Sequence, residues 1–266
     1  MGHDKLRKFA ENETFACLLQ PDPSAILDKS VPDRGLHLND HPVKGCWNAR
    51  MFARELPIVL ELGCGKGEYT IDLSSRLPEN NYIGVDIKGA RLWKGAKYAT
   101  EHKLPNVAFL RTRIEFIEAF FAPGEVSEIW LTFTDPQLKS ENSRLTSPVF
   151  LERYRRFLKP GGRIHLKTDS RFLHEYSKAV AEENGLRILA STTDLYGERS
   201  IDNPALYEVQ TFYERMFLSQ GYKITYLEFE IDKDGDYVSP SSFDSDYWRS
   251  VEGPRRFSHS PEKASF

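Results

Sequence analysis

The stretch Ile58-Val-Leu-Glu-Leu-Gly-Cys-Gly-Lys-Gly67 decides the fold of this chain. An apolar run ends at Gly63, and glycines then stand at every second position as far as Gly67. The next residues, Glu68-Tyr-Thr-Ile-Asp-Leu-Ser74, continue with helical periodicity. This order predicts a buried strand, a tight turn and a helix.

A second short apolar run, Asn81-Tyr-Ile-Gly-Val-Asp86, ends in a carboxylate. Glycine in the preceding turn allows a ligand to approach the backbone at the start of a helix. A carboxylate at the tip of the next strand can accept hydrogen bonds from both hydroxyls of a ribose. The two stretches together predict a site for a cofactor that contains a nucleoside.

The spacing of the glycines argues against the two common phosphate-binding turns. A dinucleotide fingerprint needs its third glycine three residues after the second, where this chain has Glu68, and a phosphate loop needs Ser or Thr after Lys66. The pattern Gly-x-Gly-x-Gly, with Glu61 before it and Asp86 after it, is similar to the first two motifs of class I methyltransferases. That resemblance implies S-adenosylmethionine as the cofactor. The alternative is a glycine-rich turn in another α/β protein.

The composition is that of an ordinary globular protein. The chain has 266 residues, of which 40% are hydrophobic, and one α/β domain with extensions is the simplest organisation. We expect an irregular N-terminal arm at 1–50, a methyltransferase domain at 51–231 and a polar C-terminal tail at 232–266. No apolar run has membrane-spanning length and no signal-peptide core stands at the N-terminus. We therefore expect a cytoplasmic protein that is not associated with a membrane.

The net charge and the spacing of the cysteines limit the kinds of binding site that the chain can have. The net charge is −3, so nucleic-acid binding would have to depend on a local patch. The three cysteines have no metal-ligand spacing, and we predict neither a metal site nor a disulfide framework.

From residue 57 onward, predicted strands and helices alternate. The strands are predicted at 57–62, 81–86, 106–110, 127–133, 163–167, 186–191 and 223–230. The helices are predicted at 67–77, 90–103, 113–121, 148–158, 170–184 and 206–220. Such alternation predicts a mostly parallel sheet with helices on both faces, whose strand tips at 63, 86, 133 and 167 converge on one crevice.

A third candidate segment follows the strand Glu128-Ile-Trp-Leu-Thr-Phe133 and reads Thr134-Asp-Pro-Gln-Leu-Lys139. Pro136 disfavours the helical conformation at Asp135, so the carboxylate is expected at an extended strand tip beside the cofactor. The alternative is that Asp135 only orders the turn, because Asp-Pro turns are common.

These segments and several later ones together resemble the tRNA (guanine-N7)-methyltransferases, from about residue 57 to 230. The matching segments are Glu61–Gly67, Gly84–Asp86, Gly124–Val126, Leu131–Pro136, Lys139, Arg144–Thr146, Leu158–Gly162, Lys167–Asp169 and Thr211–Glu214. The resemblance implies a Rossmann-like class I fold. It also implies an enzyme that uses S-adenosylmethionine to form 7-methylguanosine in the variable loop of tRNA.

The same resemblance implies roles for individual residues. The implied cofactor-binding residues are Glu61, Gly63, Gly65, Gly67, Asp86, Arg113 and Asp135, and Asp135 is also the implied catalytic residue. The implied substrate-binding residues are Lys139, Asp169, Thr211, Phe212, Tyr213 and Glu214. Arg113 stands where the family usually has Asn or Asp, so we expect its backbone rather than its side chain to bind the adenine.

The loop after Asp135 departs from the family pattern. Relatives commonly continue Asp-Pro-Trp-Pro-Lys-Lys-Arg-His, whereas here only Lys139 and Arg144 are cationic. We therefore expect other cations to hold the RNA, and the candidates are Lys88, Arg91, Lys94 and Lys97, or Arg153, Arg155, Arg156, Lys159 and Arg163. The alternative for either group alone is a solvated helix face, and the first group has the better case because it starts directly after Asp86. Two alternatives remain open: a methyltransferase for a small molecule or protein, and a non-catalytic RNA-binding subunit. We expect a monomer or homodimer.

Overall fold

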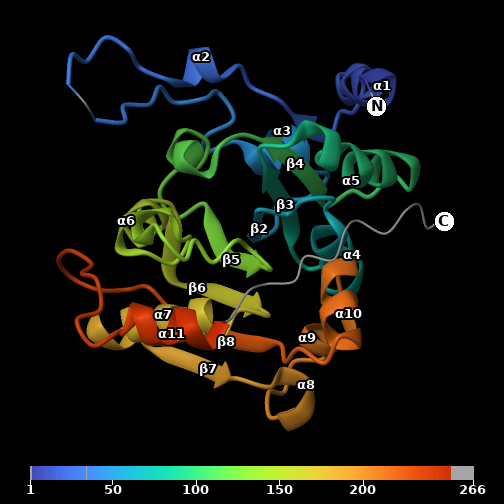
Figure 1. Cartoon of the computed structure of the whole chain (residues 1–266). Helices are drawn as coiled ribbons and strands as arrows, with labels where there is room; N and C mark the ends of the chain where they lie inside the picture. The colour runs from blue at the N-terminus through green and yellow to red at the C-terminus, as the bar shows by residue number, and fades with distance from the viewer. Residues whose placement is uncertain (1, 34, 253–266) are drawn as a thin grey trace.

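The computed structural model describes residues 2–33 and 35–252 (Figure 1). Eight strands form one sheet. They are β1 (Leu18–Leu19), β2 (Ile58–Leu62), β3 (Asn81–Asp86), β4 (Val107–Arg111), β5 (Val126–Thr132), β6 (Leu158–Thr168), β7 (Ile188–Thr192) and β8 (Thr225–Glu230). Their order across the sheet is β1-β4-β3-β2-β5-β6-β8-β7, and only the pairs that involve β8 are antiparallel.

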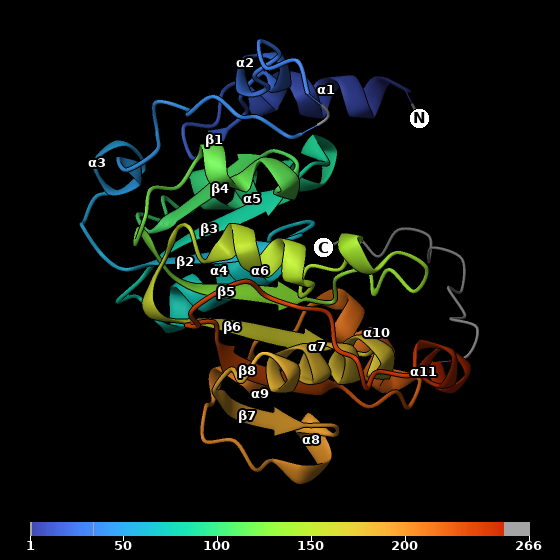
Figure 2. The same cartoon turned by 90° about the vertical axis from the view of Figure 1, so that its left-hand side faces the viewer.

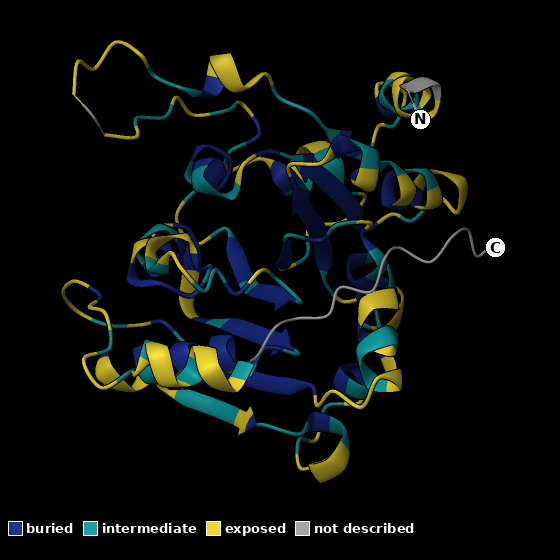
Figure 3. Cartoon of the chain, viewed as in Figure 1, coloured by how far each residue is buried: buried dark blue, intermediate teal, exposed yellow. Residues whose placement is uncertain are grey.

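Helices cover both faces of this sheet (Figure 2). They are α1 (Gly2–Asn12), α2 (Pro23–Ile26), α3 (Trp47–Met51), α4 (Glu68–Arg76), α5 (Gly89–Glu101), α6 (Pro148–Tyr154), α7 (Arg171–Glu183), α8 (Leu195–Glu198), α9 (Ala205–Glu208), α10 (Phe212–Ser219) and α11 (Ser245–Glu252), with 3₁₀ helices η1 (Ile114–Ala119) and η2 (Glu141–Ser143). One face packs against α3, η1, α6 and α7, and the other against α4, α5, α9 and α10. The central strands are buried between these layers (Figure 3), which confirms the predicted fold.

The strand order reverses at β2. The chain runs from β2 outward through β3 to β4, then returns to the other side of β2 with β5 and β6. In such sheets, ligands bind outside the carboxyl ends of the strands at this point of reversal. The residues that follow β2 and β5 are therefore the ones to examine for a site.

The prediction of a single helix at 206–220 is wrong, because the structure has two helices in this segment. Val209 follows α9 with an extended backbone, and Thr211 then begins α10 by accepting a hydrogen bond from the Glu214 amide at 3.1 Å. A side chain that satisfies a free amide at the start of a helix stabilises a new helix there. The periodicity of the segment did not reveal this break.

The first 50 residues are only partly irregular, because α1, β1, α2 and the start of α3 lie among them. Helix α1 packs on α5, where the Asn12 side-chain amide donates to the Gly89 carbonyl at 2.9 Å and the Trp93 indole donates to Glu11 at 2.6 Å. Strand β1 then pairs in parallel with β4 and forms one edge of the sheet. Two residues of strand are too few to give a period that sequence reading can detect.

Residues 232–252 also differ from the expected solvated tail. The Tyr237 ring is buried, and the Val238 amide donates to the Asn184 side chain at 2.9 Å. Helix α11 then packs against α7. The rest of the predicted tail, 253–266, lies outside the described residues. Among the helices that the structure describes, none combines the length and apolar character needed to cross a bilayer.

Three glycines make room for the Phe109 ring on one face of the sheet. A Cβ atom at Gly67 would lie 2.5 Å from that ring, one at Gly95 would lie 2.6 Å from it, and one at Gly84 2.8 Å. No Cβ is tolerated at such distances without movement of the ring. Close packing between α4, α5 and the sheet, together with its φ of +73°, is enough to explain a glycine at position 67.

Candidate functional site

The turn after β2 is held by the carboxylate at the tip of β3. Gly63 and Gly65 both have positive φ, +80° and +58°. Asp86 is only 8% exposed, and its Oδ2 accepts from the Gly65 amide at 3.0 Å while its Oδ1 accepts from the Lys88 amide at 2.7 Å. Each oxygen keeps a further lone pair, so Asp86 can order the turn and still accept hydrogen bonds from a ligand.

Glu61 lies beneath the same turn and joins three elements. Its Oε1 accepts from the Thr132 hydroxyl at 2.5 Å, and its Oε2 accepts from the amide of Thr70 at 2.8 Å and from the hydroxyl of that residue. Burial raises the pKa of Glu61 to about 7, because the charged form loses its hydration. Glu61 therefore ties β2 to β5 and α4, and it also lines the cavity above the turn.

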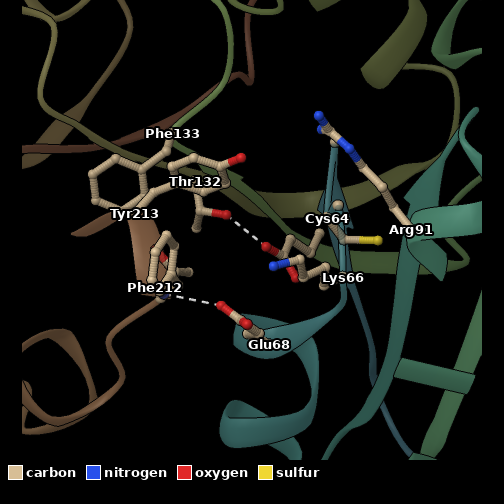
Figure 4. Close-up of a pocket in the computed structure, with 12 residues that line it drawn as sticks. Cys64, Lys66, Glu68, Arg91, Thr132, Phe133, Phe212 and Tyr213 are labelled. Carbon is tan, nitrogen blue, oxygen red and sulfur yellow. Dashed lines mark hydrogen bonds between the residues drawn. The ribbon is translucent and has the colours of Figure 1, made fainter. Parts of the chain in front are cut away.

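Two neighbouring cavities open at this edge of the sheet. The smaller, which we call the turn cavity, has a volume of about 90 Å³ and is lined by Glu61, Gly63, Cys64, Gly65, Lys66, Glu68, Arg91, Thr132, Phe133, Thr211, Phe212 and Tyr213 (Figure 4). The larger, which we call the large cavity, has a volume of about 730 Å³ and includes Asp86, Ile87, Arg113, Ile114, Leu145 and Phe150 in its lining. Gly63 and Arg91 line both, so the two cavities adjoin.

These residues fit a nucleoside-bearing cofactor. A Cβ at Gly65 would meet no atom within 4 Å, so the backbone there faces open space. Asp86 stands beside the apolar side chains of Ile87 and Ile114 in the large cavity, which suits a ribose next to an aromatic base. Arg113 also lines this cavity, with a half-exposed side chain paired to Glu115 at 3.3 Å.

The structure places Asp135 at the rim of the two cavities and not in their linings. Its side chain is exposed, and Oδ1 accepts from the Gln137 amide at 2.9 Å, so it orders the turn after β5. The described linings of the turn cavity and the large cavity do not include it. Gln137 does line the large cavity, which puts the Asp135 loop at the rim of the site.

The predicted substrate residues are divided among four places. Thr211, Phe212 and Tyr213 line the turn cavity. Lys139 is exposed on the Asp135 loop, and Asp169 lines a separate cavity that also includes Lys223 and Glu252. The structure thus brings only the 211–213 stretch to the glycine turn.

Glu214 does not line the turn cavity but lies in the interior. It is 0% exposed, its Oε1 lies 2.7 Å from the Lys167 ammonium, and the same oxygen accepts from the Tyr196 hydroxyl at 2.7 Å. A base in the cavity cannot reach an enclosed carboxylate of this kind. This enclosure does not fit the expected direct contact between Glu214 and guanine.

Sequence reading missed several residues of the turn cavity. Thr132 ends β5, Phe133 follows it, and Glu68 begins the helix after the glycines. In Figure 4, Phe133, Phe212 and Tyr213 form one wall, and the Phe212 amide donates to Glu68 at 2.9 Å. Phe133 gave no usable signal, because an aromatic residue at the end of a strand is more simply explained by packing.

Comparisons with known proteins agree with this geometry. Residues 55–227 match the family described as "Putative methyltransferase". The chain is 49% identical over 246 residues to the tRNA (guanine-N(7)-)-methyltransferase of Porphyromonas gingivalis, covering 92% of this chain and 97% of that protein. It is 45% identical over 257 residues to the protein of that name from Bacteroides thetaiotaomicron, covering 96% and 97%.

Solved structures support the same fold. The 16S rRNA methyltransferase KamB superposes with a TM-score of 0.50 at 16% identity, covering 69% of this chain and 88% of that one. This likeness concerns the fold alone, whereas the relatives above match along nearly the whole chain. The chain belongs to the tRNA (guanine-N(7)-)-methyltransferase family.

Proposed function

We propose that this protein transfers a methyl group from S-adenosylmethionine to N7 of a guanine in tRNA. The observation that carries the proposal is the Asp86 carboxylate at the tip of β3, bonded to the Gly65 amide beside open space. The names of relatives at 45–49% identity supply the substrate class.

The cofactor supplies an electrophilic methyl group on a sulfonium. In our proposal, Asp86 accepts hydrogen bonds from its ribose, and Ile87 and Ile114 contact its adenine in the large cavity. The bare backbone at Gly63 and Gly65 then allows the rest of the cofactor to approach the turn.

The methyl transfer itself asks little acid–base chemistry of the protein. Guanine N7 carries a free lone pair at neutral pH, so no proton has to leave, and holding the reacting atoms in line is the main contribution. Phe133, Phe212 and Tyr213 offer aromatic surfaces on which a splayed-out base can stack. Asp135, at the rim, provides a carboxylate that would stabilise the positive charge developing on the guanine ring.

The structure also separates the two groups of candidate RNA-binding cations. Arg153 and Arg156 share the single carboxylate of Glu118, at 2.9 and 2.6 Å, so half of their charge is compensated. Lys88 and Arg91 are exposed at the start of α5, and Arg91 lines both cavities. We propose that the RNA backbone lies along α5 and not along α6.

The decisive experiment uses purified protein, labelled cofactor and two forms of unmodified tRNA. Ordinary transcripts should be labelled, and nucleoside mass spectrometry should find 7-methylguanosine. Transcripts made with 7-deazaguanosine should stay unlabelled, because a C–H group replaces N7. Labelling of proteins or metabolites but not of tRNA would reject the proposal.

Three finer points belong to the same proposal. We propose that the modified guanine lies in the variable loop, that the protein acts in the cytoplasm where its substrate is, and that it works as a monomer or homodimer. Fragment mapping of the labelled tRNA tests the first point. Light scattering of the purified protein with and without tRNA tests the last.

A further inference from the structure

A buried ion pair links the sheet to the aromatic wall of the turn cavity. Lys167 on β6 and Glu214 on α10 are both 0% exposed, and Nζ lies 2.7 Å from Oε1. Burying two charges is costly unless both are paired and hydrogen-bonded. Such a pair is retained only where the neighbouring structure satisfies it.

The surroundings of the Lys167 ammonium meet this condition. Oε1 of Glu214 is bonded twice, whereas its buried Oε2 has no hydrogen-bond partner among the described residues. The ammonium donates to the carbonyls of Leu206 at 2.6 Å and Val209 at 3.1 Å in addition to Glu214, so all three of its N–H groups have acceptors. The rings of Tyr69 and Tyr196 lie 5.3 and 5.7 Å away and add cation–π contacts. Through these bonds one side chain holds the end of α9, the linker and α10 together.

The backbone of Lys167 holds the opposite part of the wall. Its carbonyl accepts from the Phe133 amide at 2.9 Å, where Phe133 has a positive φ of +51°. A non-glycine residue in that conformation persists only when its surroundings hold it there. Phe133, Phe212 and Tyr213 are thus all set in place through elements that Lys167 joins.

We propose that Lys167 and Glu214 are positioning residues that fix this aromatic wall, and that Glu214 acts on guanine only through Phe212 and Tyr213. The inference rests on the proposed function, because it concerns the binding of the substrate base. Glu214 immediately follows the two exposed aromatic residues of α10. Loosening its bond to Lys167 would free the start of α10 while leaving Asp86 and the glycine turn in place.

The test compares Glu214→Gln and Lys167→Met with wild type on two tRNAs. One carries guanosine and the other inosine at the methylated position. Inosine keeps N7 but lacks the 2-amino group that a directly bound carboxylate would accept from. For each variant we expect an unchanged cofactor Kd by calorimetry and a tRNA KM raised about tenfold, equivalent to about 1.4 kcal/mol. The ratio of kcat/KM between the two tRNAs should stay as in wild type.

Each other outcome has a defined meaning. If Glu214→Gln abolishes discrimination between guanosine and inosine, Glu214 contacts the base and the inference is overturned. A lower melting temperature with unchanged KM and kcat would reduce the pair to a purely structural role and overturn it too. If wild type labels neither tRNA, the proposed function fails instead.

A control variant and a second test variant allow the result to be interpreted. Lys178→Met removes the cation of an exposed pair with Glu182, 3.7 Å apart on α7, and should change none of these constants. If Lys167→Met does not fold, Glu214→Gln decides alone, because its amide oxygen can still accept from Lys167 and Tyr196.

Discussion

At Asp86, one carboxylate accepts from two backbone amides and also faces the large cavity. Asp86→Ala should weaken cofactor binding by about 1.5 to 3 kcal/mol, since the ribose loses a charged acceptor and the turn loses its brace. Titration calorimetry measures this directly. Asp72→Ala, on the outer side of α4, is the control, and equal affinity in both variants would mean that the site has been misassigned.

Two substitutions of Asp135 distinguish a role in methyl transfer from a role in ordering the turn. Asparagine retains an oxygen that can accept from the Gln137 amide, whereas alanine does not. If the charge serves methyl transfer, Asp135→Asn and Asp135→Ala should both lower kcat with the fold intact. Full activity in the asparagine variant would leave Asp135 with only its turn-ordering role.

Glu61 should make stability depend on pH. The folded protein holds a proton on this carboxyl up to about pH 7, whereas its ordinary pKa is 4.5. Folding therefore favours the protonated form, and the stability it contributes below pH 4.5 is lost as the pH rises to about 7.

Glu61→Gln removes this titration and keeps the shape of the side chain. Between pH 4.5 and 7, the stability of the variant relative to wild type should rise by about 3 kcal/mol in denaturant unfolding. The Thr132 hydroxyl can turn to accept from the new amide. A difference that does not vary with pH would show that Glu61 is ionised in the folded protein.

At the scale of elements, Phe109 sets the distance between β3, α4 and α5. Gly84→Ala would place its Cβ 2.8 Å from that ring and 2.8 Å from the Thr70 hydroxyl oxygen. Overpacking of this kind should destabilise the protein by about 1 to 3 kcal/mol. Thermal unfolding provides the measurement.

A second substitution tests whether the ring is the cause. Phe109→Leu shortens the side chain that the new methyl group meets, so the double variant should lose less stability than the sum of the two single variants. Strict additivity would instead assign the cost to Thr70 or to the backbone of β3.

At the scale of the whole molecule, both extensions pack on the central sheet. Trp47 and Ile26 are buried in its main core, and Tyr237 joins the same core from the C-terminal side. We expect limited proteolysis of the native protein to spare residues 2–252 apart from exposed loops. Rapid release of a compact 51–231 fragment would instead support the boundaries that composition alone predicts.

The sequence by itself determined the sheet and the identity of the glycine turn. Gly63 and Gly65 could be placed in this turn, and Asp86 at the tip of the next strand, from the sequence alone. A tight turn, a bare backbone and an acceptor at a strand tip are local requirements, and residues close together in the chain meet each of them. The alternation of predicted strands and helices indicated a mostly parallel sheet for the same reason.

Only the tertiary structure decided what the more distant residues do. Gly67 proved to accommodate Phe109, and Glu214 proved to bind Lys167, because each role depends on a partner remote in sequence. The same holds for α1, whose contacts with α5 are made by single side chains without a recognisable period. Burial and long-range pairing arise from how elements pack, and a local pattern does not encode them.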